Sequence, residues 1–192
     1  MKNKVNIIAE IANAHQGSPE LAKDLARSAA ESDADSIKFQ IYFADEFLTT
    51  NHPKFEHFKK QSFSRQTWND ILTEVKKTEK EIYADIFGLQ ALELARENDI
   101  DGIKVHSSDL TNTRLLEELA YYDKKLFLAT GGSSLIEIRY ALDHINLYNR
   151  SSEIVLLHGF QAYPTNIEDS SLLRIAKMSE LFSDNISLGY MD

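Results

Sequence analysis

Four short apolar segments of this chain each end in polar or charged residues, and each is followed by a stretch with helical spacing. The segments are Ile7–Glu10, Ser36–Gln40, Gly102–Asp109 and Ile154–His158. A strand that helices cover should be apolar nearly throughout, so charged residues within such runs need a partner or a ligand. Glu10, Lys38 and Lys104 are therefore candidates for a site that takes an anionic molecule.

The strands and helices that these patterns predict alternate along the whole chain. We expect strands at Val5–Ala12, Ser36–Tyr42, Glu81–Phe87, Gly102–Ser107, Lys125–Thr130, Glu153–Phe160 and Ile186–Met191. We expect helices at Pro19–Ser32, Gln66–Lys80, Leu89–Glu97, Thr113–Tyr122, Leu135–Leu147 and Glu168–Phe182. Residues 43–64 are expected to form a long irregular segment rich in phenylalanine.

Strands that alternate with helices indicate parallel strands joined by helical crossovers. The polar residues lie at the carboxyl ends of the strands, where a TIM-type (β/α)8 barrel builds its site. A doubly wound sheet is the alternative, but no Gly-x-Gly-x-x-Gly loop follows the first strand. We count seven strands and six helices, so we predict an α/β chain with one barrel domain over residues 1–192 that is incomplete at its C-terminus.

Composition restricts the partners and the chemistry of the chain. The formal net charge of −9 argues against nucleic acid or an anionic membrane as the main partner. The absence of cysteine rules out disulfides and thiolate chemistry. No apolar run approaches the roughly 20 residues of a membrane helix, and the first residues do not read as a signal peptide. We expect a cytoplasmic protein.

Several short motifs follow one another in a recognisable order. They are Ile8–Gly17, Ala34–Gln40, Ile103–Asn112, Thr130–Gly131, Leu156–His158, Tyr163–Thr165, Glu168–Asp169 and Gly189–Asp192. Each motif alone is weak, but the ordered set resembles the N-acetylneuraminate (sialic acid) synthase family, including its relatives that make other nonulosonic acids.

This resemblance implies a transferase that condenses phosphoenolpyruvate with an N-acetylmannosamine-type amino sugar, which gives a nine-carbon 2-keto acid and phosphate. It implies that Glu10 is a catalytic carboxylate that handles a proton or stabilises a cationic carbon. The implied substrate-binding residues are Lys38, Gln40, Lys104, Ser107, Asp109, Thr130, Gln161, Tyr163 and Asp192. Among them, Lys38 and Lys104 match lysines that bind phosphoenolpyruvate, and Asp109 matches an acidic residue that contacts the sugar.

The resemblance also implies a divalent metal, Mn or Mg, that polarises the sugar aldehyde. The two metal histidines of the family lie beyond Asp192, so no metal ligand is assigned within this chain. We expect this chain to lack the small C-terminal domain of the family, which is similar to type III antifreeze protein, and the resemblance implies a homodimer for the full-length form. We therefore expect the 192-residue chain alone to be inactive and only marginally soluble.

Several positions depart from the family pattern and keep two hypotheses open. Asp85 replaces a threonine that helps to hold phosphate, and Ala129, Phe160 and Met191 replace small polar residues. These changes indicate an altered substrate or a decayed site. The first hypothesis is a nonulosonic-acid synthase, and the second is a non-catalytic or fragmentary member that binds an anionic sugar or a partner protein. Structurally, the charged strand residues would then serve as ion-pair partners.

Overall fold

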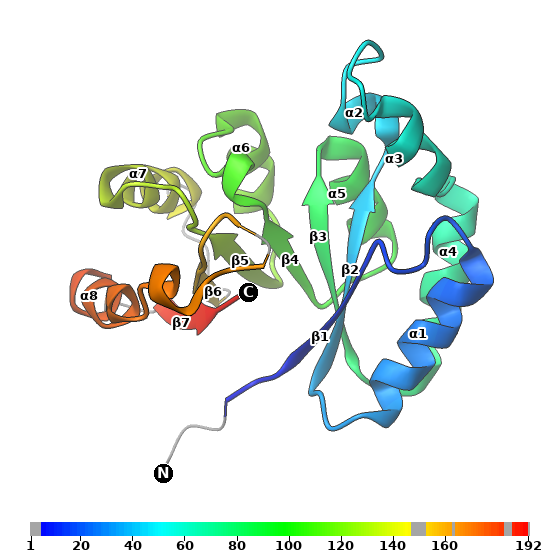
Figure 1. Ribbon diagram of the computed structural model, residues 1–192, viewed down its shortest axis with the longest axis horizontal. Coiled ribbons are helices and arrows are strands. Elements are labelled where there is room, and N and C mark those ends of the chain that lie inside the picture. Colours follow the sequence, from blue (N-terminus) through cyan, green and yellow to red (C-terminus); the bar gives the residue numbers. More distant parts are fainter. Residues whose placement is uncertain (1–4, 147–152, 163, 183–185, 192) are drawn as a thin grey trace. The chain divides into compact units, whose positions relative to one another are not determined.

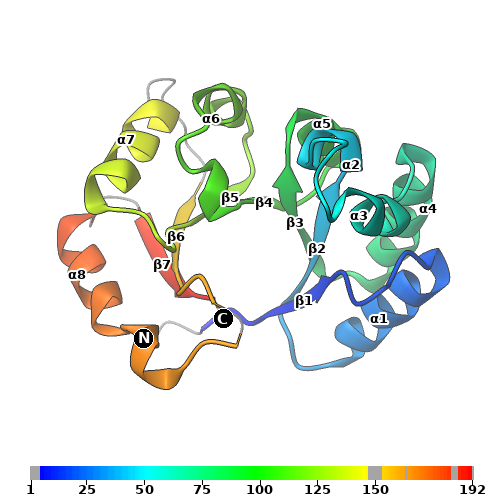
Figure 2. The ribbon, with the colours of Figure 1, turned by 45° about the horizontal axis from the view of Figure 1, so that its top comes forward.

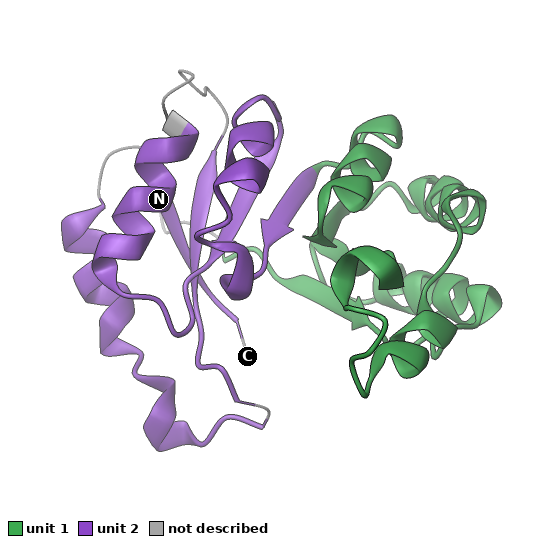
Figure 3. Ribbon diagram, turned by 90° about the horizontal axis from the view of Figure 1, so that it is seen from above, with its two compact units in different colours: residues 1–101 green, residues 102–192 purple. Residues whose placement is uncertain are grey.

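Strands and helices alternate through the computed structural model, which describes residues 5–146, 153–162, 164–182 and 186–191. Figure 1 and Figure 2 show helices packed around parallel strands. The chain forms two compact units, residues 1–101 and residues 102–192, which Figure 3 distinguishes by colour. We describe the two units separately below.

Unit 1 contains three parallel strands whose order follows the chain. They are β1 (Ile8–Ala12), β2 (Ser36–Tyr42) and β3 (Glu81–Phe87). Three longer helices accompany them, α1 (Pro19–Glu31), α4 (Arg65–Val75) and α5 (Leu89–Glu97), and the 3₁₀ turn η1 (Lys76–Thr78) follows α4. Ser18 accepts a hydrogen bond from Leu21 N and so caps α1, with Pro19 at the first helical position as predicted. The apolar residues of β2 are fully buried and form the centre of this unit.

Two short helices occupy the segment that we expected to be irregular. They are α2 (Ala44–Phe47) and α3 (Phe55–Gln61). The ring of Phe47 lies 5.1 Å from that of Phe58 and 4.8 Å from that of Phe87, so aromatic packing orders this segment. Those contacts join residues that are far apart in the chain, and no periodic pattern in the sequence predicts them.

A carboxylate from α2 caps the first turn of α5. Glu46 Oε1 accepts a hydrogen bond from Leu89 N at 2.8 Å, and Glu46 Oε2 accepts one from Gln90 N at 3.0 Å. Gly88 has a φ of +105°, and a Cβ at that position would collide with the Glu46 side chain. The glycine therefore allows the carboxylate to reach the helix end.

Unit 2 contains four parallel strands, again in chain order. They are β4 (Gly102–Val105), β5 (Lys125–Ala129), β6 (Ile154–His158) and β7 (Ile186–Tyr190). The helices are α6 (Thr113–Ala120), α7 (Leu135–Asn146) and α8 (Leu173–Leu181), with 3₁₀ turns η2 (Ser107–Asp109) and η3 (Ile167–Ser170). β4 and β6 are fully buried, whereas β7 is half-buried to exposed.

The alternation of parallel strands and helices confirms the predicted α/β class, and the element bounds need three corrections. The described residues contain eight α-helices where we predicted six. The helix expected over Glu168–Phe182 is interrupted at Ser171, whose φ of +48° is left-handed, so η3 and α8 replace it. β4 ends at Val105, so Ser107 lies in η2 and not in the strand. None of the described helices is long and apolar enough to cross a membrane.

Candidate functional site

The ammonium group of Lys38 lies directly against the carboxylate of Glu10, where β2 pairs with β1. The Lys38 side chain is 8% exposed and the Glu10 side chain is 38% exposed. A second carboxylate, the fully buried Asp85 of β3, places its Oδ2 atom 3.9 Å from Lys38 Nζ. A buried ammonium needs such counter-ions. The three groups together carry a formal charge of −1.

A backbone irregularity fixes the Glu10 carboxylate in place. The pairing register of β1 shifts between Glu10 and Ala12, and Ala12 has a φ of +46°. The shift turns Ala12 N toward Glu10, and this amide donates a hydrogen bond to Glu10 Oε1 at 3.1 Å. One carboxylate oxygen is thus held by the bulge and the other by Lys38. Bulges that aim a side chain in this way are common beside active sites.

Gln40 on β2 belongs to a second polar group of unit 1. Asn13 Nδ2 donates to Gln40 Oε1 at 3.5 Å, and the Tyr42 hydroxyl donates to Asn13 Oδ1 at 3.2 Å. Burial raises the pKa of Tyr42 to about 12, so this hydroxyl remains a neutral donor at physiological pH. The chain from Tyr42 through Asn13 orients the Gln40 amide.

Three predicted site residues of unit 2 have well-defined surroundings. Lys104 lies buried in β4. Thr130 is fully buried and donates its hydroxyl hydrogen to Leu157 O at 3.1 Å, so it joins β5 to β6 and can only accept from a ligand. Asp109 accepts a hydrogen bond from Asn112 Nδ2 at 3.0 Å. Because Asn112 caps α6, Asp109 supports that cap.

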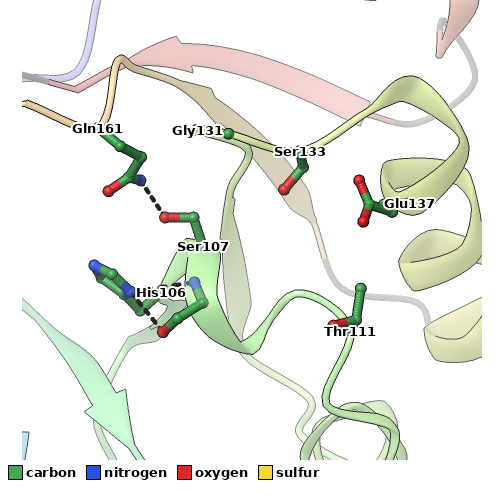
Figure 4. Close-up of a pocket in the computed structure, with 9 residues that line it drawn as sticks. His106, Ser107, Thr111, Gly131, Ser133, Glu137 and Gln161 are labelled. Atoms are coloured by element: carbon green, nitrogen blue, oxygen red, sulfur yellow. Dashed lines mark hydrogen bonds between the residues drawn. The ribbon is translucent and has the colours of Figure 1, made fainter.

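Ser107 and Gln161 meet at the edge of a pocket in unit 2, shown in Figure 4. The Gln161 Nε2 amide donates a hydrogen bond to Ser107 Oγ. A Cβ added to Gly131 would lie 2.5 Å from Gln161 Nε2, so the Gln161 side chain requires glycine beneath it. The pocket measures about 310 Å³ and is lined by His106, Ser107, Ser108, Thr111, Gly131, Gly132, Ser133, Glu137 and Gln161.

Our reading of the sequence assigned only Ser107 and Gln161 of these nine residues to a site, and it missed seven, His106, Ser108, Thr111, Gly131, Gly132, Ser133 and Glu137. One signal was available, because Ser134 and Glu137 have the spacing of a capping box. Glu137 Oε2 accepts from Ser134 N at 2.7 Å and from Ser134 Oγ at 2.8 Å. These two hydrogen bonds, the backbone one first, lower the pKa of Glu137. The carboxylate is therefore charged and fixed at the start of α7.

Two predicted site residues, Tyr163 and Asp192, lie outside the described residues. The expected convergence of Glu10 and Lys38 with Lys104 and Tyr163 stays a prediction, as does the substrate role of each site residue. Within the described ranges, no group of three or more His, Asp or Glu side chains could hold a metal ion. The described residues thus do not provide a site for the divalent metal that the resemblance implies.

The comparisons with known proteins agree on one kind of protein. A crystal structure of N-acetylneuraminic acid synthetase from Leptospira borgpetersenii matches with a TM-score of 0.91 at 28% identity, covering 99% of this chain and 65% of that chain. An uncharacterised protein of Methanocaldococcus jannaschii is 31% identical over 97% of this chain and 54% of its own length. The N,N'-diacetyllegionaminic acid synthase of Legionella pneumophila is 29% identical over 97% of this chain and 56% of its own length.

These matches define the class of nonulosonic-acid synthases, and they confirm the predicted TIM-type barrel fold and the predicted resemblance. Residues 25–192 match the NeuB family, and the chain belongs to it. It spans about half the length of the curated relatives that it matches.

Proposed function

We propose that this chain takes part in the condensation of phosphoenolpyruvate with an open-chain N-acetylmannosamine-type amino sugar. In this reaction carbon 3 of phosphoenolpyruvate forms a bond with the aldehyde carbon, and the aldehyde oxygen takes a proton. Water adds to carbon 2, and the bond between carbon 2 and the phosphate oxygen breaks. The products are a nine-carbon 2-keto acid and inorganic phosphate.

The single observation that carries this proposal is the Glu10–Lys38 pair. Glu10 is the more exposed partner, so a ligand can reach its carboxylate while Lys38 stays buried beneath it. A carboxylate fixed by a backbone amide and an ammonium can stabilise the cationic carbon 2 that forms as the new carbon–carbon bond is made. It can also handle the proton of the attacking water.

The anionic substrate gives the second line of support. Phosphoenolpyruvate carries a carboxylate and a phosphate, and Lys38 and Lys104 are the buried cations at strand ends of the described chain. The Leptospira synthetase was crystallised in complex with citrate, another multiply charged anion. We propose that this chain likewise binds an anionic ligand.

Three further features of the whole protein belong to the same proposal. They are a divalent metal, Mn or Mg, that supplies Lewis-acid polarisation of the aldehyde when bound, a homodimeric state, and a cytoplasmic location. The resemblance supports each of them.

One observation favours the alternative, a family member that binds an anionic sugar or a partner without catalysis. Asp85 places a second carboxylate 3.9 Å from Lys38, so this lysine is shared between two carboxylates before any substrate arrives. A lysine that is already paired is less available to phosphoenolpyruvate. The alternative therefore predicts weak phosphoenolpyruvate binding and no turnover.

The test is phosphate release by the full-length gene product and, beside it, by the 192-residue chain, each incubated with phosphoenolpyruvate, Mn²⁺ and a series of 2-acetamido sugars, with mass detection of the keto acid. We expect the full-length product to release phosphate only when both substrates are present, Glu10→Gln to abolish this release, and the 192-residue chain alone to release none. Glu20→Gln, a change in an exposed carboxylate of α1, is the matched control and should leave the rate unchanged. Weak phosphoenolpyruvate binding together with no release for any sugar would favour the alternative, and release unaffected by Glu10→Gln would remove Glu10 from the mechanism.

A further inference from the structure

The pocket of unit 2 has a composition that an anionic substrate does not explain. Four of its lining residues carry hydroxyls, and others carry an imidazole and an amide. None of the nine lining residues is a lysine or an arginine, and Glu137 contributes a carboxylate. Lys104, the buried lysine of the same unit, is not part of the lining. A pocket of this composition suits a ligand that is neutral and rich in hydroxyls.

The hydrogen bonds within the pocket divide it into a closed edge and an open edge. At the closed edge Ser107 and Gln161 bind each other. At the open edge Figure 4 shows Thr111, Ser133 and Glu137 around the same hollow. Within the described residues no hydrogen bond is made by the hydroxyls of Thr111 and Ser133 or by the Oε1 atom of Glu137. Two donors that can also accept and one strong acceptor are thus available to a ligand.

The start of α7 would otherwise be a natural anion site, because the first N–H groups of a helix favour negative charge. Here Glu137 already supplies that charge through its bonds to the backbone and side chain of Ser134. A phosphate group in the pocket would meet this carboxylate at close range and without a cation from the lining. The charge of the pocket therefore acts against a phosphorylated ligand.

We propose that the edge formed by Thr111, Ser133 and Glu137 binds the hydroxyl-bearing part of the amino sugar and selects an unphosphorylated sugar over its phosphate ester. This inference rests on the proposed function in one respect, that an amino sugar is the acceptor. Thr111 and Ser133 exchange hydrogen bonds with sugar hydroxyls, and Glu137 Oε1 accepts from a hydroxyl or an acetamido N–H. The volume of about 310 Å³ lies in the range of small-ligand sites.

The experiment measures equilibrium binding to the 192-residue protein by calorimetry, with N-acetylmannosamine and its 6-phosphate ester as probes. We expect the neutral sugar to bind at least about tenfold more tightly than the ester, because the ester brings like charge to Glu137. Thr111→Val and Ser133→Ala should each weaken binding of the neutral sugar by about three- to tenfold, the worth of one hydrogen bond. Thr73→Val, a change in an exposed residue of α4 outside the pocket, is the matched control and should change nothing.

Glu137→Gln separates charge from shape, because glutamine keeps an oxygen that can accept from Ser134 N. This variant should bind the phosphate ester about tenfold more tightly than the wild type does, and it should weaken binding of the neutral sugar by about three- to tenfold, because the glutamine NH2 cannot accept a hydrogen bond in place of Oε1. Circular dichroism of each variant checks that α7 is intact. Equal or tighter binding of the ester by the wild type would overturn the inference. Failure of the neutral sugar to bind, or indifference to both hydroxyl deletions, would overturn it as well.

The outcome is distinguishable from that of the condensation test. Sugar binding that depends on Thr111 and Ser133 without phosphate release would leave the pocket inference standing and remove the proposed reaction. Phosphate release that proceeds faster with the phosphorylated sugar would do the opposite.

Discussion

The polar groups of the two units find their partners in opposite ways. In unit 1 the charges satisfy one another, because Lys38 is held between Glu10 and Asp85. In unit 2 the pocket is lined mainly by uncharged groups, and the hydroxyls of Thr111 and Ser133 face it without a described partner. The difference follows from burial. A charge that is nearly removed from water must be paired, whereas a hydroxyl at a pocket edge can exchange hydrogen bonds with solvent.

The largest effect should come from removing the central cation of unit 1. Lys38→Met leaves the fully buried Asp85 beside Glu10 without their shared counter-ion. We expect a loss of about 3–5 kcal/mol in the free energy of unfolding, measured by urea denaturation. Adding Asp85→Asn should recover part of the loss. Ser133→Ala in unit 2 should stay within about 0.5 kcal/mol. If both variants had the same stability, the two units would not differ as described.

A smaller loss should follow from filling the space beneath Gln161. Gly131→Ala places a Cβ 2.5 Å from Gln161 Nε2 and 2.9 Å from Gly159 O, so the loop after β5 or the Gln161 side chain must shift. We expect a cost of about 1–3 kcal/mol in thermal or urea unfolding. Gln161→Ala combined with Gly131→Ala should restore much of the stability. An additive double variant would show that the crowding comes from the backbone of Gly159 and not from Gln161.

The third prediction concerns Lys38 and its two carboxylates in unit 1, which one substitution should convert into an anion site. Asp85→Asn keeps the shape of the side chain and removes one of the two carboxylates near Lys38. We expect the affinity for inorganic phosphate to rise by about tenfold, which corresponds to about 1.4 kcal/mol. Calorimetric titration measures it, with Asp33→Asn, an exposed change of equal charge, as the control. An equal rise in both variants would point to net charge alone.

The smallest effect concerns acid stability at the start of α7. The folded-state pKa of Glu137 is lowered below its ordinary value of 4.5 by Ser134. A lowered pKa contributes stability that is fully present above the unfolded value and is lost as pH falls through the folded value. The difference in melting temperature between wild type and Glu137→Gln should therefore be constant near neutral pH and shrink below about pH 4.5. A difference that persists at pH 2 would contradict a charge-dependent cap.

The sequence predicted the charged residues of the strands better than it predicted the residues that line the pocket. Lys38 and Glu10 interrupt apolar runs. Because burying a lone charge costs free energy, such an interruption indicates that the residue has a partner or a ligand. Thr111 lies between η2 and α6, whereas Ser133 precedes α7 and Glu137 lies in its first turn, and only the folded chain brings them around one pocket. An exposed hydroxyl group costs the folded protein little free energy. Nothing in the sequence context therefore distinguishes a serine that binds a ligand from one that contacts only solvent.

The helical segments show a related limit. Pro19 and its preceding serine mark the start of α1 locally, so that prediction was correct. The break at Ser171 requires a left-handed residue that is neither glycine nor asparagine, which local preferences disfavour. Phe47 of α2 packs against Phe87, about forty residues away in the chain, and Phe58 of α3 packs against Phe47. Tertiary packing, which local preferences do not report, therefore orders α2 and α3.

Glu46 of α2 caps α5, so the protection of the first amides of α5 depends on the position of α2. The carboxylate lies 43 positions from the amide of Leu89, yet it is the acceptor that keeps this amide and that of Gln90 from water. When α2 lifts away, both amides lose their acceptor and their hydrogens become free to exchange with solvent. We therefore expect hydrogen exchange at the amides of Leu89 and Gln90 to report on the opening of the α2 segment.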